Sequence, residues 1–136
     1  MVDDVVLNKA AVIERCLARI DAEYVGHEDS LETDLTRQDS IILNLLRACE
    51  AAIDLAMHET RILKLGIPRQ TREAFDLLAG AGVLDAALSG RMKAMVGFRN
   101  IAVHDYQALD LRIVRAIVEE RLDDFHAFVK AMLERA

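Results

Sequence analysis

The stretch IILNLLRACEAAIDLAM, Ile41–Met57, decides the fold, because its apolar side chains recur at the spacing of an α-helix. They form one broad apolar face, which consists of Ile42, Leu45, Leu46, Cys49, Ile53, Ala56 and Met57. A helix with such a face buries it against other helices. We expect this helix to begin after an N-cap at Thr36. It should end near residue 65, because Gly66 suits the position after a helix end and Pro68 forbids continuation.

Similar patterns predict helices on both sides of this stretch. Residues 3–24 form one amphipathic helix, and a polar, acidic loop over residues 26–34 follows it. A short helix is expected over about residues 72–79, with Thr71 as its cap. A longer helix begins at Asp85, and its apolar face leads toward the segment of the chain that is richest in side chains able to do chemistry.

The last pattern begins after Asp110, an expected N-cap, and continues for more than six helical turns. Four long helices and one short helix, joined by brief loops, predict an all-α fold in the form of an up-and-down helical bundle. The chain has 136 residues, which fits one domain over residues 1–136. So wide an apolar stripe on so small a bundle also predicts a symmetric homodimer.

Composition narrows the class of protein. The hydrophobic fraction of 53% is typical of a packed globule. The N-terminus lacks a basic segment followed by an apolar one, and no apolar run is long enough to cross a bilayer, so we expect a cytoplasmic protein with no membrane partner. Cys16 and Cys49 fall on apolar helix faces and are expected to be free, buried thiols. Neither a metal nor a cofactor is expected, because no Cys/His metal spacing or glycine-rich phosphate loop occurs.

Groups able to do chemistry gather in GFRNIAVHDY, Gly97–Tyr106, where the helical pattern that begins at Asp85 runs out. Arg99 has a permanent, forked charge suited to phosphate, and His104 can exchange a proton near neutral pH. Arg99 also continues the buried stripe of its helix, four residues after Met95, so its charge needs a partner or a cleft. A bare R-x4-H spacing is equally compatible with a salt-bridged or helix-capping pair.

Three further side chains are candidates to support this pair. Glu50 and Asp54 lie along one edge of the second long helix, where they can orient Arg99 or His104. They also fit a ladder of ion pairs within their own helix. Asn100 can hydrogen-bond a phosphate, hold His104 in one tautomer, or cap a helix end.

The charge of the chain is unevenly distributed. The net charge is −6, which argues against a general affinity for nucleic acid. Residues 61–99, however, carry seven basic and three acidic side chains and lead directly into the motif. The basic side chains ahead of Arg99 are RNA-binding candidates or else a solvated surface: Arg61, Lys64, Arg69, Arg72, Arg91 and Lys93.

The motif Arg99–Tyr106 resembles the R-x4-H-x-Y signature of HepT-type toxins in the HEPN superfamily. Other segments resemble the same family and extend the similarity over most of the chain: Ile41–Leu45, Glu50–Asp54, Leu65–Pro68, Arg72–Phe75 and Met95–Phe98. The resemblance implies a dimeric ribonuclease toxin of a type VII-like toxin–antitoxin pair, whose antitoxin is a minimal nucleotidyltransferase of MntA type. It implies that Arg99 and His104 are catalytic. It also implies that the antitoxin attaches AMP to Tyr106 and so silences the enzyme.

The implied chemistry needs no metal. RNA carries its own nucleophile in the 2′-hydroxyl, so RNA is the expected substrate, as tRNA or mRNA, and DNA is not. His104 can act as general base or general acid, and Arg99 can stabilise the anionic phosphorane. One histidine cannot be both base and acid in the same step. A two-fold dimer that brings two motifs together supplies both histidines, so we expect the site at the subunit interface.

Two other hypotheses remain open at this point. In one, the chain is a non-catalytic helical binding module that positions nucleotide or substrate for a partner nucleotidyltransferase. In the other, it is a purely structural bundle in which the Arg99/His104 pair caps a helix, and the ring of Tyr106 packs at the edge of the bundle.

Overall fold

The computed structural model describes residues 3–135, and this part of the chain is helical without a strand. The long helices α1 (Asp4–Tyr24), α2 (Leu35–Ile62) and α4 (Ala86–His104) are followed by the shorter helices α5 (Leu111–Glu120) and α6 (Leu122–Glu134). The remaining elements are short: α3 (Glu73–Gly80) and the 3-10 turns η1 (Glu28–Ser30) and η2 (Tyr106–Ala108). The all-α prediction is confirmed.

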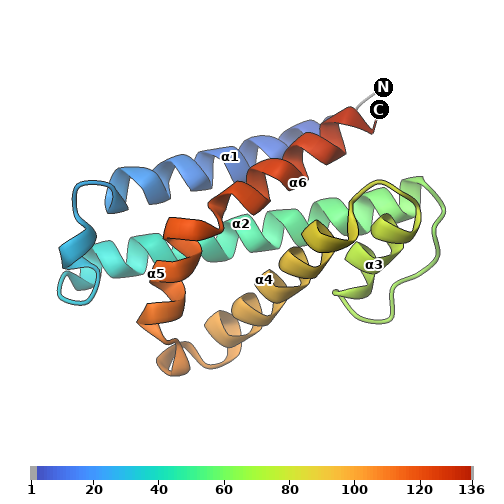
Figure 1. Cartoon of the computed structure of the whole chain (residues 1–136). Coiled ribbons are helices and arrows are strands. Elements are labelled where there is room, and N and C mark those ends of the chain that lie inside the picture. The colour runs from blue at the N-terminus through green and yellow to red at the C-terminus, as the bar shows by residue number, and fades with distance from the viewer. Residues whose placement is uncertain (1–2, 136) are drawn as a thin grey trace.

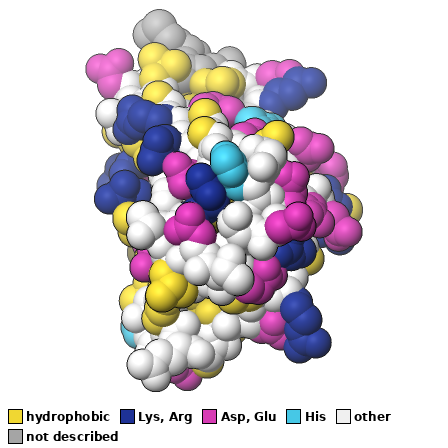
Figure 2. Space-filling model, turned by 90° about the vertical axis from the view of Figure 1, so that its left-hand side faces the viewer, with side chains coloured by type: hydrophobic (Ala, Val, Ile, Leu, Met, Phe, Trp, Pro, Cys, Tyr) yellow, Lys and Arg dark blue, Asp and Glu magenta, His cyan; other side chains and the backbone are white. Residues whose placement is uncertain are grey.

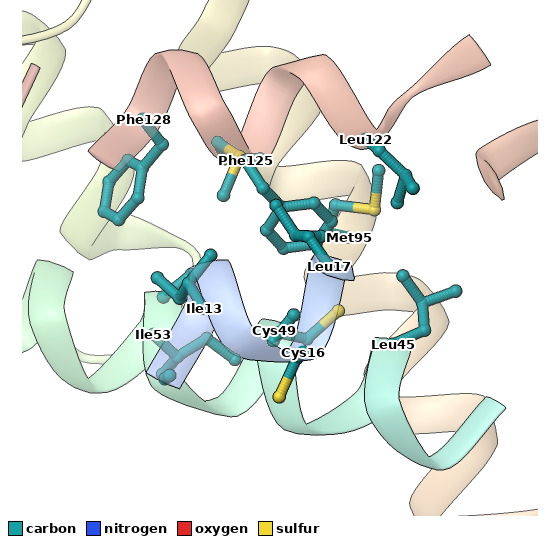
Figure 3. Close-up of a cluster of buried hydrophobic side chains, with 14 of the residues drawn as sticks. Ile13, Cys16, Leu17, Leu45, Cys49, Ile53, Met95, Leu122, Phe125 and Phe128 are labelled. Atoms are coloured by element: carbon teal, nitrogen blue, oxygen red, sulfur yellow. The ribbon is translucent and has the colours of Figure 1, made fainter. Parts of the chain in front are cut away.

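The helices α1, α2 and α6 lie alongside one another, and α4 crosses beneath α2 (Figure 1). Their facing sides form one hydrophobic core, in which Phe125 and Phe128 of α6 meet apolar side chains of α1, α2 and α4 (Figure 3). The ring of Phe128 also packs edge-on against Phe75 of α3, with 5.7 Å between the ring centroids. Cys16 and Cys49 lie in this core as free thiols, as expected.

The predicted single final helix is wrong, because the chain turns between α5 and α6 at Arg121, whose φ is −123° and ψ is 0°. The apolar spacing continues without interruption from Val118 to Leu122, so the sequence pattern does not show the turn. Long-range contacts hold α5 in its separate direction. Arg115 donates hydrogen bonds to the Tyr24 hydroxyl at 2.7 Å and to a carboxylate oxygen of Glu32 at 2.6 Å.

The helix caps agree only in part with expectation. Asp85 and Asp110 are N-caps, and each accepts a hydrogen bond from a backbone N–H of the first turn that follows. The cap of α2 is Asp34 rather than Thr36, and its side chain accepts from the Arg37 N–H at 3.1 Å. The short helix α3 has no side-chain cap, so the role expected for Thr71 is also wrong.

The predicted acidic loop at residues 26–34 is mostly exposed, but it contains η1 and the fully buried Leu31. Figure 2 looks onto this end of the bundle, where many charged side chains reach the surface and Asp and Glu gather on one side. Within residues 3–135, no helix is long and apolar enough to cross a membrane.

Candidate active site

The helix α4 carries both members of the Arg/His pair and ends at His104, within the Gly97–Tyr106 segment where the helical pattern was expected to run out. Asp105 ends it with a φ of −153° and a ψ of 63°, and the next three residues form η2. The last turns of α4 project beyond the core, which leaves Ile101 and Val103 44% and 50% exposed. The apolar pattern fades there for this reason although the helix continues.

Arg99 points from α4 toward α2 and is held by a carboxylate of that helix. Its Nε donates to Glu50 Oε1 at 2.7 Å, and its Nη2 lies 3.5 Å from Glu50 Oε2. Its Nη1 donates to Asn100 Oδ1 at 2.8 Å. The guanidinium is therefore fixed in orientation while the side chain keeps 23% of its surface exposed. The charge of Arg99, which was predicted to need a partner, is therefore paired with Glu50.

His104 lies at the C-terminal end of α4 and is exposed to solvent. It follows Arg99 by five residues, which corresponds to about 140° of rotation and about 7.5 Å of rise along an α-helix. The two side chains therefore leave the helix in different directions. The pair does not bond internally as a helix cap, because Asp105 N–H to Ile101 O, at 2.8 Å, closes the end of the helix.

Tyr106 stands in η2 with 44% of its surface exposed, and its hydroxyl donates to Asp39 Oδ1 of α2 at 2.7 Å. Partial burial and the adjoining Asp39 carboxylate raise the pKa of Tyr106 from 10.0 to about 12. The phenol is consequently neutral at physiological pH. The ring lies at the edge of the bundle, with its hydroxyl directed at a carboxylate.

Of the two acidic candidates on α2, only Glu50 contacts Arg99. Asp54 lies one turn further along α2 and pairs with Lys9 of α1 at 3.0 Å. The structure therefore gives Asp54 no part in orienting the motif, and it leaves Glu50 as the supporting carboxylate.

The basic segment before Arg99 does not converge on the motif as a whole. Two of its members are occupied elsewhere, since Arg91 pairs with Asp124 at 2.7 Å and Lys93 with Asp76 at 2.8 Å. The candidates Arg61 and Lys64 line a hollow beside Pro68, at the end of α2 that is far from Asp39. Arg69 follows Pro68 in the loop between α2 and α3.

Arg72 alone among these candidates lines a hollow together with Asn100. Its Nη2 would lie 3.1 Å from a Cβ atom placed on Gly97, so the glycine permits this close approach to α4. Arg72 is therefore the basic side chain that the structure brings closest to the motif.

One group of side chains has the donor types and spacing of a metal site. Ligand atoms of Asp3, His58 and Glu59 lie within 4.8 Å of one another. The fully buried Glu59 is paired with the guanidinium of Arg135, and His58 Nε2 lies 2.7 Å from Asp3 Oδ2. Because each of the two carboxylates already has a partner in the chain, the group is better explained as a structural clamp between the ends of the chain.

Asp39 is the contact residue that the sequence interpretation missed. Asp39 and Glu50 are eleven residues apart, close to three helical turns, so both lie on the same face of α2. That spacing was the available signal, although it does not reveal the tyrosine that Asp39 binds.

The fold and this site define a class: a helical protein in which one helix of the bundle, α4, presents a buttressed arginine, an exposed histidine and, just beyond its end, a tyrosine. A family model described as HepT-like, ribonuclease HepT-like, matches residues 13–132. The chain belongs to this family.

The relatives are similar over nearly their whole length. The chain is 49% identical over 127 residues to the mRNA nuclease HepT of Shewanella oneidensis, covering 93% of this chain and 95% of the relative. It superposes with a TM-score of 0.92 and 47% identity on the structure of tri-AMPylated Shewanella oneidensis HEPN toxin in complex with MNT antitoxin, over 97% and 98% of the two chains. A toxin–antitoxin structure with AMP-PNP gives the same TM-score, with 46% identity over 97% and 99%.

Proposed function

We propose that this protein is the ribonuclease toxin of a toxin–antitoxin pair, cleaving RNA of the mRNA class without a metal ion. The observation that carries the proposal is the buttressed guanidinium of Arg99 on the same helix as the exposed imidazole of His104. Membership of a ribonuclease family and the mRNA nuclease relative support the activity and the substrate class.

The reaction follows from these two groups. His104 takes the proton of a 2′-hydroxyl, the freed oxygen attacks the adjacent phosphorus, and the bond from phosphorus to the 5′-oxygen breaks. The leaving oxygen receives a proton from a second histidine, and the product ends in a 2′,3′-cyclic phosphate. Arg99, fixed by Glu50, stabilises the extra negative charge on the phosphorane. General acid–base catalysis of this kind contributes a factor of about 10² to 10⁴ in rate.

A second copy of the chain supplies the second histidine. The outer side of α4 and the facing side of α5 enclose a groove of about 980 Å³, bordered by Ile101 and Ile113, which are 44% and 53% exposed. Such an unpartnered apolar surface beside His104 suits a symmetric contact between two α4 helices. Light scattering should therefore give the mass of a dimer at micromolar concentration. A monomer alone would remove this part of the proposal.

The partner is a nucleotidyltransferase antitoxin, and Tyr106 is the residue it modifies. The Tyr106 hydroxyl attacks the α-phosphorus of ATP, its proton is lost, and pyrophosphate leaves. The adenylate brings negative charge and bulk to the position two residues beyond His104, and both oppose the approach of an RNA phosphate to that histidine. Complexes of similar toxins with an MNT antitoxin, one of them tri-AMPylated, support this assignment.

The nuclease is tested by substrate chemistry. RNA should be cut to products with 2′,3′-cyclic phosphate ends, and the same sequence with 2′-deoxyribose throughout should remain intact. Expressed alone, the wild type should arrest growth, whereas Arg99→Ala and His104→Ala should not. Equal growth arrest by either variant would falsify the proposed site. Binding to the antitoxin without any cleavage would identify a binding module instead.

The modification is tested by intact mass. After co-expression with the antitoxin, the wild type should gain AMP-sized increments, and Tyr106→Phe should gain none. Increments that persist in Tyr106→Phe would exclude this residue as the acceptor.

A further inference from the structure

A basic groove lies between the middle of α1 and the first half of α2, apart from the Arg99/His104 pair. It encloses about 620 Å³ and has Arg15 and Arg19 on one wall, Arg47 on the other, and Asp39, Ser40 and Asn44 beside them. The first 60 residues carry 13 acidic and five basic side chains, so three arginines around one groove run against the local average.

Ion pairs along the two helices fix which residues face one another. Lys9 pairs with Asp54 at 3.0 Å and Arg37 with Glu23 at 3.7 Å, so α1 and α2 are antiparallel in a known register. This register places Arg15 opposite Arg47 and Arg19 nearer to Asp39.

The groove arginines are largely free to bind an anion. Arg15, Cys16 and Arg47 all line the groove; burial raises the pKa of the Cys16 thiol, and the charges of Arg47 and Arg15 oppose this rise. Arg15, Arg19 and Arg47 are exposed. Only Arg19 has an ion-pair partner within residues 3–135, a loose contact with Glu23 at 3.8 Å.

Asp39 joins this groove to Tyr106, because it lines the groove and also accepts the hydrogen bond of the tyrosine hydroxyl. An adenylate on Tyr106 removes the hydroxyl proton and places a negative phosphodiester beside the Asp39 carboxylate. The hydrogen bond is then lost, and two like charges repel. The modified side chain has to move toward positive charge, and the arginines of the groove begin at Asp39 itself.

We propose that this groove binds the phosphodiester chain of adenylates attached to Tyr106, through Arg15, Arg19 and Arg47, in contact with Asp39. This inference rests on the proposed modification of Tyr106. From Asp39 to Arg47 the groove follows α2 for eight residues, about 12 Å, so it is long enough to hold more than the first phosphate. A similar toxin is tri-AMPylated, and three adenylates joined in one chain would occupy a groove of this length.

The attached chain fits this groove better than an RNA substrate does. A tethered chain meets the arginines at a high effective concentration, so contacts that are individually weak suffice to hold it. The groove also lies across the exposed side of α2 from Arg99, which faces α4. Adenylates drawn into it are shielded from enzymes that remove them.

The test compares the wild type with a triple variant, Arg15→Ala with Arg19→Ala and Arg47→Ala. Both are modified by co-expression with the antitoxin, purified, and treated with a 3′→5′ phosphodiesterase while intact mass is followed. Each exposed contact should account for about a twofold to threefold effect, so the adenylates beyond the first should be removed roughly tenfold faster from the triple variant. A matched control, Arg61→Ala with Arg69→Ala and Lys130→Ala, removes three charges elsewhere and should lose its adenylates at the wild-type rate.

The outcomes separate the groove from the modification. If adenylates on Tyr106 are removed equally fast from both proteins, the proposed role of the groove is refuted and the modification of Tyr106 still holds. A wild type that carries no adenylates overturns the modification and the groove with it. A triple variant that receives no adenylate at all assigns the arginines to docking of the antitoxin. The unmodified triple variant should cleave RNA at the wild-type rate. If it cleaves RNA slowly while its adenylates are removed at the wild-type rate, the groove binds RNA instead of adenylates.

Discussion

Replacing Glu50 with glutamine separates the orientation of Arg99 from the stability of the bundle. In Glu50→Gln the amide oxygen can still accept from Arg99 Nε, but the second contact, at 3.5 Å, and the carboxylate charge are lost. The Glu50 side chain is 42% exposed, so the ion pair contributes at most about 1 kcal/mol to the free energy of unfolding. In a chain of this size, that loss lowers Tm by about 4 °C.

The effect on cleavage should be larger than the effect on stability. A guanidinium free to rotate still attracts the RNA phosphate, but it no longer meets the phosphorane in a fixed direction. We expect kcat to fall by about tenfold to a hundredfold with little change in KM. The measurement is steady-state cleavage of a fluorescent RNA, with thermal unfolding of the same preparations.

Asp54→Asn is the matched control, because Asp54 lies one turn away on α2 and pairs with Lys9 instead of Arg99. It should leave kcat unchanged. In an Arg99→Ala background, Glu50→Gln should have no further effect on cleavage, since the two residues act as one unit. Wild-type kcat in Glu50→Gln, or an equal loss in Asp54→Asn, would refute the reasoning.

Three further predictions concern the tyrosines and the turn between α5 and α6. Asp39→Asn should lower the pKa of Tyr106 from about 12 toward 10.0, because the raising effect of the carboxylate is lost. Ultraviolet titration in a Tyr24→Phe background measures Tyr106 alone, since these are the two tyrosines of the chain. An unchanged titration midpoint would contradict the prediction. Both tyrosine pKa values are raised from 10.0 to about 12, so the stability they contribute should be fully present below pH 10.0 and lost as pH rises through about 12. Urea unfolding between pH 10.0 and about 12 should show this decline in the free energy of unfolding for the wild type and a smaller decline for Tyr106→Phe. An equal decline in the two proteins would contradict the prediction. Arg115→Ala should lower the urea midpoint more than Arg112→Ala, since Arg115 bridges α5 to the α1–α2 connection whereas Arg112 bonds only the adjacent cap.

The helices could be predicted from the sequence because their apolar faces have a clear period, as in Ile41–Met57. The N-cap at Asp110 and the start of a helix at Asp85 were correctly predicted for a local reason, since each side chain bonds the first turn of its own helix. The turn at Arg121 could not be predicted, because the spacing from Val118 to Leu122 fits an unbroken helix.

The residues of the site likewise fall into those that a local pattern predicts and those that depend on helix packing. That Arg99 faces inward followed from its position four residues after Met95, and Glu50 was one of two candidate partners. The choice of Glu50 over Asp54 required the placement of α4 against α2. The contact from Tyr106 to Asp39 joins residues 67 positions apart, and no local pattern indicates it. Local periodicity thus predicts which way a side chain faces, whereas its partner depends on how the helices pack.

The central claim is that His104 and Arg99 cleave RNA without a metal ion. It is tested most directly by single-turnover cleavage of one RNA in excess chelator, with wild type and His104→Ala at equal, saturating concentration. The account predicts that the wild type retains its full rate in chelator and that His104→Ala is slower by about a hundredfold or more. A wild type silenced by chelator, or a His104→Ala variant that cleaves at the wild-type rate, would contradict it.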